Sequence, residues 1–166
     1  MMTGTPRLAL PFLSPGQAQK EFTHNEALQS LDIAVALAVE EPPRADPPAT
    51  PSIGNCYIVD ASATGAWAGR SQSVAGFTTG GWRFLAPLEG LTAYVKSNSV
   101  WALYREGSWE LGVVRGSLVS IGGQQVVGTR AAPIPSASGG ANIDAEARAT
   151  IDQILGVLRH HGLIDQ

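Results

Sequence analysis

The side chains best suited to acid–base or metal chemistry, the three histidines, are scattered along the 166-residue chain. His24 stands alone in the first part, whereas His160 and His161 close a helical pattern near the C-terminus. Neighbouring residues on a helix point about 100° apart, so these two rings would not bind one ion together. Basic residues at a helix C-terminus also complement the helix dipole. We therefore expect no metal site.

Nucleophilic or glycosidic catalysis finds little support in the sequence. The single cysteine, Cys56, lies in an apolar run typical of a buried strand, and no Gly-x-Ser-x-Gly elbow is present. Hydrolysis of a glycosidic bond needs two facing carboxylates, but Glu89 and Glu106 each precede a glycine and predict turns. The glycine pairs match no phosphate-binding loop. We predict a protein that is not an enzyme and that needs no cofactor.

Aromatic side chains are the remaining candidates for binding, and they concentrate in the middle of the chain. All four tryptophans and all three tyrosines lie between residues 57 and 109. In a small sheet such rings are first of all core and cross-strand pairs, although exposed ring faces can also stack on sugars. Trp67, in a Gly-flanked turn, has the weakest reason to be core. The candidate glycan contacts are Trp67, Trp82, Tyr104 and Trp109.

The elements that must position these residues begin with an N-terminal arm and helix, residues 1–41. The pattern Ser-Pro-Gly-Gln at residues 14–17 resembles a capping box and predicts a helix that begins at Pro15. Apolar residues at helical spacing predict its buried face, which widens in the last turns so that the helix is buried there. The face consists of Phe22, Leu28, Leu31, Val35 and Ala38, widened by Ile33, Leu37 and Val39.

A proline-rich connector, residues 42–52, is expected to be an extended polyproline-like spacer. From residue 53 to 130 the apolar period changes to two, and glycine, serine and asparagine punctuate the runs, which predicts an aromatic-rich antiparallel β domain. This meander could close into a small barrel or a sandwich. The predicted strands are residues 55–60, 74–78, 81–86, 91–96, 100–105, 108–114, 118–121 and 124–128.

A Pro/Ser/Gly-rich linker, residues 131–143, precedes a C-terminal helix in residues 144–166. Asp144 is the expected N-cap, and Gly162 the left-handed residue of a Schellman motif that folds Leu163 back on Leu158. A lone amphipathic helix this short is marginal in water, so we expect its apolar stripe to meet other copies. The predicted oligomerisation residues are Ile151, Ile154, Leu155, Leu158 and Leu163. The fold class is α+β, mainly antiparallel β.

Composition and charge limit the partners and the location. The net charge of −3 and the absence of a basic cluster provide no footprint for nucleic acid. No stretch approaches the roughly 20 apolar residues of a membrane span, and the first residues do not form a signal peptide. We expect a protein made in the cytoplasm, with neither nucleic acid nor membrane as a partner.

Three motifs resemble a family of uncharacterised domains found in tail-fibre and spike proteins of alphaproteobacterial phages and gene transfer agents. Residues 10–28 read Leu-Pro-Phe-Leu-Ser-Pro-Gly-Gln-Ala-Gln-Lys-Glu-Phe-Thr-His-Asn-Glu-Ala-Leu, residues 63–69 read Ala-Thr-Gly-Ala-Trp-Ala-Gly, and residues 82–87 read Trp-Arg-Phe-Leu-Ala-Pro. The resemblance spans about residues 8–111. It implies a virion structural protein, most like the base of a gene-transfer-agent head spike, which leaves the cell on the released phage-like particle.

Two main hypotheses follow. The first is a head-spike or fibre base that oligomerises, with a trimer favoured over a pentamer, binds a capsid or tail protein and a fibre protein, and aids host attachment. The alternative is a carbohydrate-binding module for host capsular or surface polysaccharide, for which Trp67→Ala would abolish binding and leave stability nearly unchanged. A glycan-degrading enzyme is a third reading, and the lack of paired acids argues against it.

Overall fold

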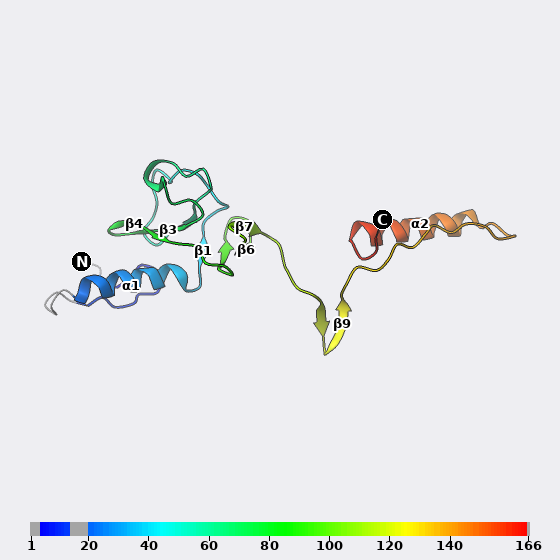
Figure 1. Ribbon diagram of the computed structural model, residues 1–166, viewed down its shortest axis with the longest axis horizontal. Coiled ribbons are helices and arrows are strands. Elements are labelled where there is room, and N and C mark those ends of the chain that lie inside the picture. The colour runs from blue at the N-terminus through cyan, green and yellow to red at the C-terminus, as the bar shows by residue number, and fades with distance from the viewer. Residues whose placement is uncertain (1–3, 14–19, 166) are drawn as a thin grey trace. The chain divides into compact units, whose positions relative to one another are not determined.

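The computed structural model describes residues 4–13 and 20–165, and the predicted cap at residues 14–17 lies outside them (Figure 1). The fold is α+β, as predicted, with a helix near each end and antiparallel sheets between them. The chain forms two compact units, Met1–Val113 and Val114–Gln166. This division places the last two strands with the C-terminal helix rather than with the aromatic domain.

The first unit contains a four-stranded sheet in the order β1-β5-β6-β7. Strands β5, β6 and β7 are antiparallel neighbours, whereas β1 pairs with β5 in parallel. We expected helix where β1 lies, but helix α1 (Lys20–Ala34) ends early because Ala36 adopts a left-handed conformation with φ of 49°. The strands are β1 (Ala38–Val39), β5 (Thr92–Val95), β6 (Val100–Arg105) and β7 (Ser108–Leu111).

A second, three-stranded sheet has the order β2-β3-β4 and is antiparallel throughout. Alternate residues of its strands point to opposite faces. Cys56, Ile58 and Val74 join the core that also contains residues of the four-stranded sheet and of α1, and Tyr57 and Ala75 join a second cluster on the other face. Its strands are β2 (Cys56–Ile58), β3 (Val74–Thr78) and β4 (Gly81–Leu85).

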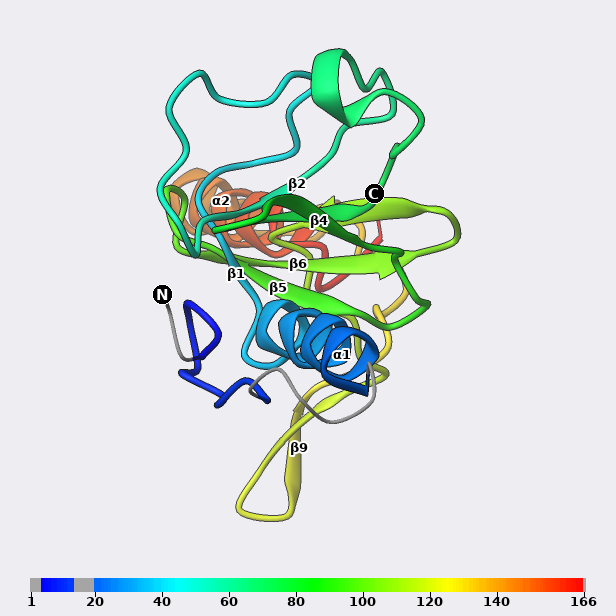
Figure 2. The same ribbon diagram turned by 90° about the vertical axis from the view of Figure 1, so that its left-hand side faces the viewer.

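The main core lies between the two sheets and the last turns of α1. Val39, Val95 and Ala102 of the four-stranded sheet are fully buried there. Ile33 of α1 enters over Gly76, where an added Cβ would stand 2.6 Å from the Ile33 Cδ1 atom. Figure 2 shows α1 alongside the strands of this unit. The sheets of the described residues form separate layers and none closes, so the barrel alternative was wrong.

Two sequence expectations for the first unit need correction. The predicted helix face is not buried at Phe22, Leu31 or Val35, whose side chains are exposed. The residues of α1 that are buried are Asp32 and Ile33, because the arm before the helix and the sheets cover that side. The connector is not a spacer either.

Residues of the connector that are not proline form backbone hydrogen bonds with the end of β2 and with the segment that follows it. Arg44 forms a parallel bridge with Val59, and its N–H donates to the Ile58 carbonyl at 3.1 Å. The N–H of Thr64 donates to the Ala45 carbonyl at 2.8 Å. Proline lacks this donor, but the pairs of prolines flank Arg44 and Ala45 and leave them free to pair.

The second unit contains the hairpin β8 (Val119–Ile121) and β9 (Gln124–Val127) and helix α2 (Ala145–His160). The predicted caps of α2 are confirmed: the Asp144 side chain accepts from the Ala147 N–H. Gly162 has φ of 68°, and its N–H and that of Leu163 close a Schellman motif onto Arg159 and Leu158. All eight predicted strands are present, most of them a residue or more shorter than expected.

Candidate functional site

A buried carboxylate on α1 holds the N-terminal arm, and sequence reasoning missed it. Asp32 is 1% exposed, and its carboxylate accepts from the Thr5 hydroxyl at 2.7 Å and from the backbone N–H groups of Arg7 and Leu8. A buried carboxylate needs such donors to offset its desolvation. The sequence did carry a signal for this contact, since Asp32 is an aspartate among the apolar residues of the last helical turns.

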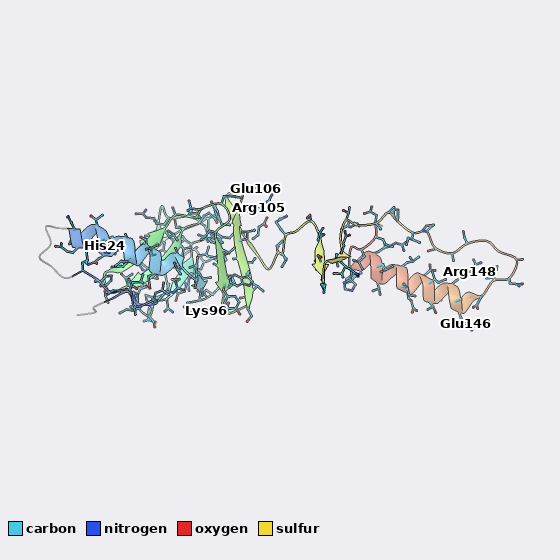
Figure 3. The ribbon with its side chains drawn as sticks, turned by 90° about the horizontal axis from the view of Figure 1, so that it is seen from below. His24, Lys96, Arg105, Glu106, Glu146 and Arg148 are labelled. Carbon is cyan, nitrogen blue, oxygen red and sulfur yellow. The ribbon has the colours of Figure 1, made fainter. Side chains whose placement is uncertain are left out.

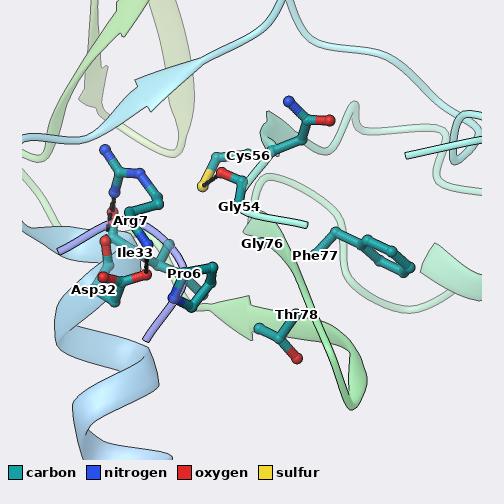
Figure 4. A pocket seen from close by; sticks show the side chains of 10 residues that line it. Pro6, Arg7, Asp32, Ile33, Gly54, Cys56, Gly76, Phe77 and Thr78 are labelled. Carbon is teal, nitrogen blue, oxygen red and sulfur yellow. Dashed lines mark hydrogen bonds between the residues drawn. The ribbon is translucent and has the colours of Figure 1, made fainter. Parts of the chain in front are cut away.

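The side chain of Arg7 completes this attachment. Its guanidinium donates to the carbonyl oxygens of Asp32 and, at 3.0 Å, of Ile33 at the C-terminal end of α1 (Figure 4). It also donates to the carbonyl oxygen of Ala36, just beyond the helix, at 2.7 Å. These carbonyls have no partner within the helix, and a cation there also complements the helix dipole. We call the set of Thr5, Arg7 and Asp32 the arm clasp.

Beside the arm clasp lies a small hollow that is partly open to solvent. Figure 4 shows Pro6, Arg7, Asp32, Cys56 and Gly76 around it. The carboxylate and the guanidinium are already engaged in the clasp, and burial raises the pKa of the Cys56 thiol to about 11. A neutral buried thiol is a poor nucleophile, so Cys56 is poorly suited to nucleophilic catalysis.

Trp67 is core, contrary to its prediction as a glycan contact. It ends a 3₁₀ turn, η1 (Gly65–Trp67), that covers the outer face of the three-stranded sheet, and its side chain is 0% exposed. Its ring lies edge-on to Trp82 at 5.1 Å and tilted against Tyr57 at 5.8 Å. The indole Nε1–H has no hydrogen-bond partner among the described residues. A sugar cannot reach this ring.

The other three candidates do not form one surface either. Trp109 is 9% exposed and belongs to the main core, where its Nε1–H donates to the Gln72 carbonyl at 2.8 Å. Tyr104 packs on it with ring centroids 5.4 Å apart. Trp82 lies half-buried on the opposite face of the three-stranded sheet with Trp67. The four predicted contacts therefore serve two separate hydrophobic clusters.

Among the tryptophans and tyrosines, the exposed residue is Trp101, which the candidate contacts did not include. It is 61% exposed and pairs across β5 and β6 with Tyr94, with ring centroids 5.5 Å apart. Strand alternation in β6 could have revealed this exposure. Neighbouring residues of a strand point to opposite faces, and Ala102 is in the core, so Trp101 points away from it. The Trp101–Tyr94 pair is thus an aromatic pair with one exposed ring on the four-stranded sheet.

The titratable side chains of the described residues do not form a metal site. No cluster of three or more histidine, cysteine, aspartate or glutamate side chains suited to a metal exists within residues 4–13 and 20–165. Of the side chains labelled in Figure 3, Glu146 and Arg148 lie on α2, Arg105 pairs with its neighbour Glu106, and His24 and Lys96 lie elsewhere in the first unit. The Glu106 N–H donates to the Glu89 carboxylate, which ties two turns together. Among the described helices, none is both long and apolar enough to cross a membrane.

The predicted oligomerisation residues divide between buried and exposed positions. Leu155 is 5% exposed and Leu158 is half-buried, whereas Ile151, Ile154 and Leu163 are exposed. The linker returns along α2 rather than detaching it. Two arginines of the helix donate to linker carbonyls, Arg159 to Ile134 at 2.6 Å and Arg148 to Ala137 at 3.3 Å.

Comparison with known proteins gives one result. The model of a family described as a protein of unknown function, DUF2793, matches residues 24–110, just over half of the chain. The chain belongs to this family. Neither the curated proteins nor the solved structures contain a match. The DUF2793 match begins within α1, ends in β7 and takes in both sheets of the first unit, while the arm clasp's Thr5 and Arg7 and the whole second unit lie outside it.

Proposed function

We propose that this DUF2793 protein is a structural component of a phage-like particle, a head-spike or fibre base that oligomerises and connects a fibre to the particle. The observation that carries the proposal is the contrast between its two units. The first has closed hydrophobic clusters, whereas the second leaves most of its large apolar side chains exposed. A protein built this way has a displayed domain and an assembly domain.

The properties of the first unit favour a scaffold or binding role. The side chains of this unit that the sequence suggested for chemistry or binding serve packing: Cys56 is buried, and Trp67 and Trp109 belong to hydrophobic clusters. Turn carboxylates are engaged with neighbouring backbone or arginine groups, as at Glu89 and at the Arg105–Glu106 ion pair. Such a domain offers a rigid surface rather than a site for substrate turnover.

The properties of the second unit favour association. Ile151 and Ile154 on α2 are 43% and 55% exposed. Exposed apolar side chains of this size that gather on one short unit mark interaction surfaces. Trimeric assembly is the form we favour, with a pentamer as the alternative, and the partners would be a capsid or tail protein and a fibre protein. The assembled particle would leave the cell and meet its host with this protein on its surface.

The proposal is tested by following the tagged chain in cells that release phage-like particles. We expect the tag to sediment with the particles and to be seen on them by immunogold electron microscopy. A matched chain that lacks residues 114–166 should stay behind in the lysate. Recovery of the intact chain only in particle-free fractions would refute a structural role.

A carbohydrate-binding module is the second candidate, and the Trp101–Tyr94 pair favours it. An exposed tryptophan beside a tyrosine can stack on a sugar ring. Binding to capsular or surface polysaccharide should then be lost in Trp101→Ala and kept in Leu88→Ala, which changes another exposed apolar residue of the same unit. Equal binding by both variants would remove this candidate.

A further inference from the structure

We propose that the side chains of Lys96 and Asn55 become joined by an amide bond, which forms once after folding with the help of the Glu40 carboxylate. The bond would tie the four-stranded sheet to the three-stranded sheet covalently. This inference concerns the first unit alone and does not depend on the proposed function. It rests on three side chains that meet at one oxygen atom.

One carboxylate oxygen of Glu40 accepts hydrogen bonds from both partners of the proposed bond. The Lys96 Nζ atom and the Asn55 Nδ2 atom each donate to Glu40 Oε1 at 2.7 Å. Two nitrogen atoms that share one oxygen at this distance can lie no further apart than twice that length. An amine and a carboxamide are thereby held close together, with a proton acceptor in contact with both.

Backbone hydrogen bonds hold these residues in place. Asn55 directly precedes β2, and Lys96 directly follows β5. Glu40 lies between the two sheets, because its N–H donates to the Cys56 carbonyl at 3.0 Å and its carbonyl accepts from the Ser97 N–H at 3.2 Å. Folding therefore brings the reacting groups together and makes their encounter an intramolecular step.

The carboxamide of Asn55 is oriented for attack at its carbon atom. Its Oδ1 atom accepts from the Ser52 N–H at 2.7 Å, while its Nδ2 atom donates to Glu40. This orientation follows from the partners, since a backbone N–H cannot accept and a carboxylate cannot donate. The Ser52 N–H stabilises the negative charge that develops on the oxygen during attack, and the nitrogen that must leave faces a group that can bring it a proton.

The proposed step needs no other reactant. The Glu40 carboxylate takes a proton from the Lys96 ammonium, and the Nζ lone pair attacks the Cγ atom of Asn55. The Nζ–Cγ bond forms and the Cγ–Nδ2 bond breaks. Nζ gives up two protons in all, Glu40 passes both to Nδ2, and that nitrogen leaves as an ammonium ion. Glu40 ends as the carboxylate it was, and the chain reacts only once.

The ion pair of Lys96 and Glu40 is partly open to water. The Lys96 side chain is 48% exposed and the Glu40 side chain is 27% exposed. Water stabilises the ammonium form of the lysine, which cannot attack. We therefore expect the step to be slow compared with folding, so that the linked form accumulates while the folded chain is stored. The same openness lets the ammonium ion escape, which disfavours the reverse reaction.

Mass spectrometry of the full chain tests the proposal. After storage of the folded protein, the intact mass should be lower than that of the sequence by about 17 Da, the mass of one ammonia. Trypsin cannot cleave after a lysine whose amine has become an amide. The digest should therefore contain a branched peptide that joins residues 45–70 to residues 84–105. The same chain stored in urea should give no branched peptide.

Two carboxylate variants test the role of Glu40. Glu40→Gln keeps the shape of the side chain but cannot carry the protons, so the linked fraction should fall by about 100-fold. Glu41→Gln changes the neighbouring carboxylate, which pairs with Arg44 at 2.5 Å, and should keep the wild-type linked fraction. Tryptophan fluorescence shows whether both variants are folded.

Three results would overturn the proposal. The first is a wild-type chain that keeps its full mass throughout storage. The second is a loss of ammonia without the branched peptide, which would mark cyclisation of an asparagine instead. The third is an equal linked fraction in folded Glu40→Gln and in the wild type, which would remove the carboxylate from the reaction.

Discussion

The buried carboxylate of Asp32 accepts the backbone N–H of Arg7 at 3.0 Å, while the Arg7 guanidinium donates to carbonyl oxygens at the end of α1. The two residues are far apart in sequence, and their mutual contacts join the arm to the helix at two points. The arm clasp thereby extends the first unit beyond the segment matched by the family. It also explains why a helix of modest apolar character ends in a fixed position.

Asp32→Asn should destabilise the first unit by about 2 to 3 kcal/mol, because hydrogen bonds to a charged acceptor are lost and an amide N–H meets backbone donors. Urea unfolding followed by tryptophan fluorescence measures this, since all four tryptophans lie in the first unit. Asp152→Asn, at an exposed position of α2, is the control and should change nothing. Equal midpoints for both variants would show that the clasp does not stabilise the fold.

Trp67→Ala should lower the free energy of unfolding by about 3 to 5 kcal/mol, as expected when a fully buried indole leaves a cavity. Trp101→Ala removes the same side chain from a 61% exposed position and should cost less than about 1 kcal/mol. This expectation reverses the prediction from sequence, in which Trp67→Ala would leave stability nearly unchanged. Similar losses in the two variants would contradict the burial assigned to Trp67.

Gly76→Ala should destabilise the first unit by about 1 to 3 kcal/mol, because its Cβ would overlap Ile33 in the packed core. Combining Gly76→Ala with Ile33→Val removes the Cδ1 atom that the new Cβ would overlap. The double variant should therefore recover part of the lost stability. Gly80→Ala is the control in the next turn, where the nearest atoms belong to the flexible end of Arg83. If Gly76→Ala were as stable as Gly80→Ala, Ile33 of α1 would have to lie further from Gly76 than the structure shows.

Burial raises the pKa of Cys56 from its ordinary 9.0 to about 11, so the unfolded chain loses this proton more readily than the folded one. The thiol contribution to stability is therefore complete below pH 9 and declines as the pH rises from 9 toward 11, by on the order of 2 kcal/mol. Cys56→Ala lacks this decline. Its stability deficit relative to the wild type should narrow between pH 8.5 and 10.5 in guanidinium titrations, and a constant deficit would argue against the shift.

Limited trypsin digestion should cut first after Arg115 and separate the two units. Residues 112–118 are exposed, and Arg115 is the only lysine or arginine between Arg105 and Arg130. Exposed connecting segments are the preferred sites of proteolysis. The large fragment should keep the native tryptophan emission spectrum, because its hydrophobic clusters are complete without residues 116–166. Emission shifted to that of the unfolded chain would show that the first unit depends on the second.

Local patterns in the sequence determined the elements of this protein. Period-two runs between turn residues located eight strands, and Asp144 and Gly162 located the ends of α2, because capping and hairpin turns depend on residues close in sequence. The sequence also showed no motif with catalytic or metal-ligand spacing. The role in a phage-like particle remains a prediction from resemblance.

Tertiary structure alone decided which of the patterned side chains are buried. Phe22 follows the same helical spacing as the core residues but is 77% exposed, whereas Asp32 is buried because an arm more than 20 residues away in sequence donates to it. Trp67 ends a Gly-flanked turn and Trp101 lies within a strand, and their opposite exposures depend on which face of which sheet each side chain meets. Burial is set by contacts between distant segments, and the period of a single segment does not contain that information.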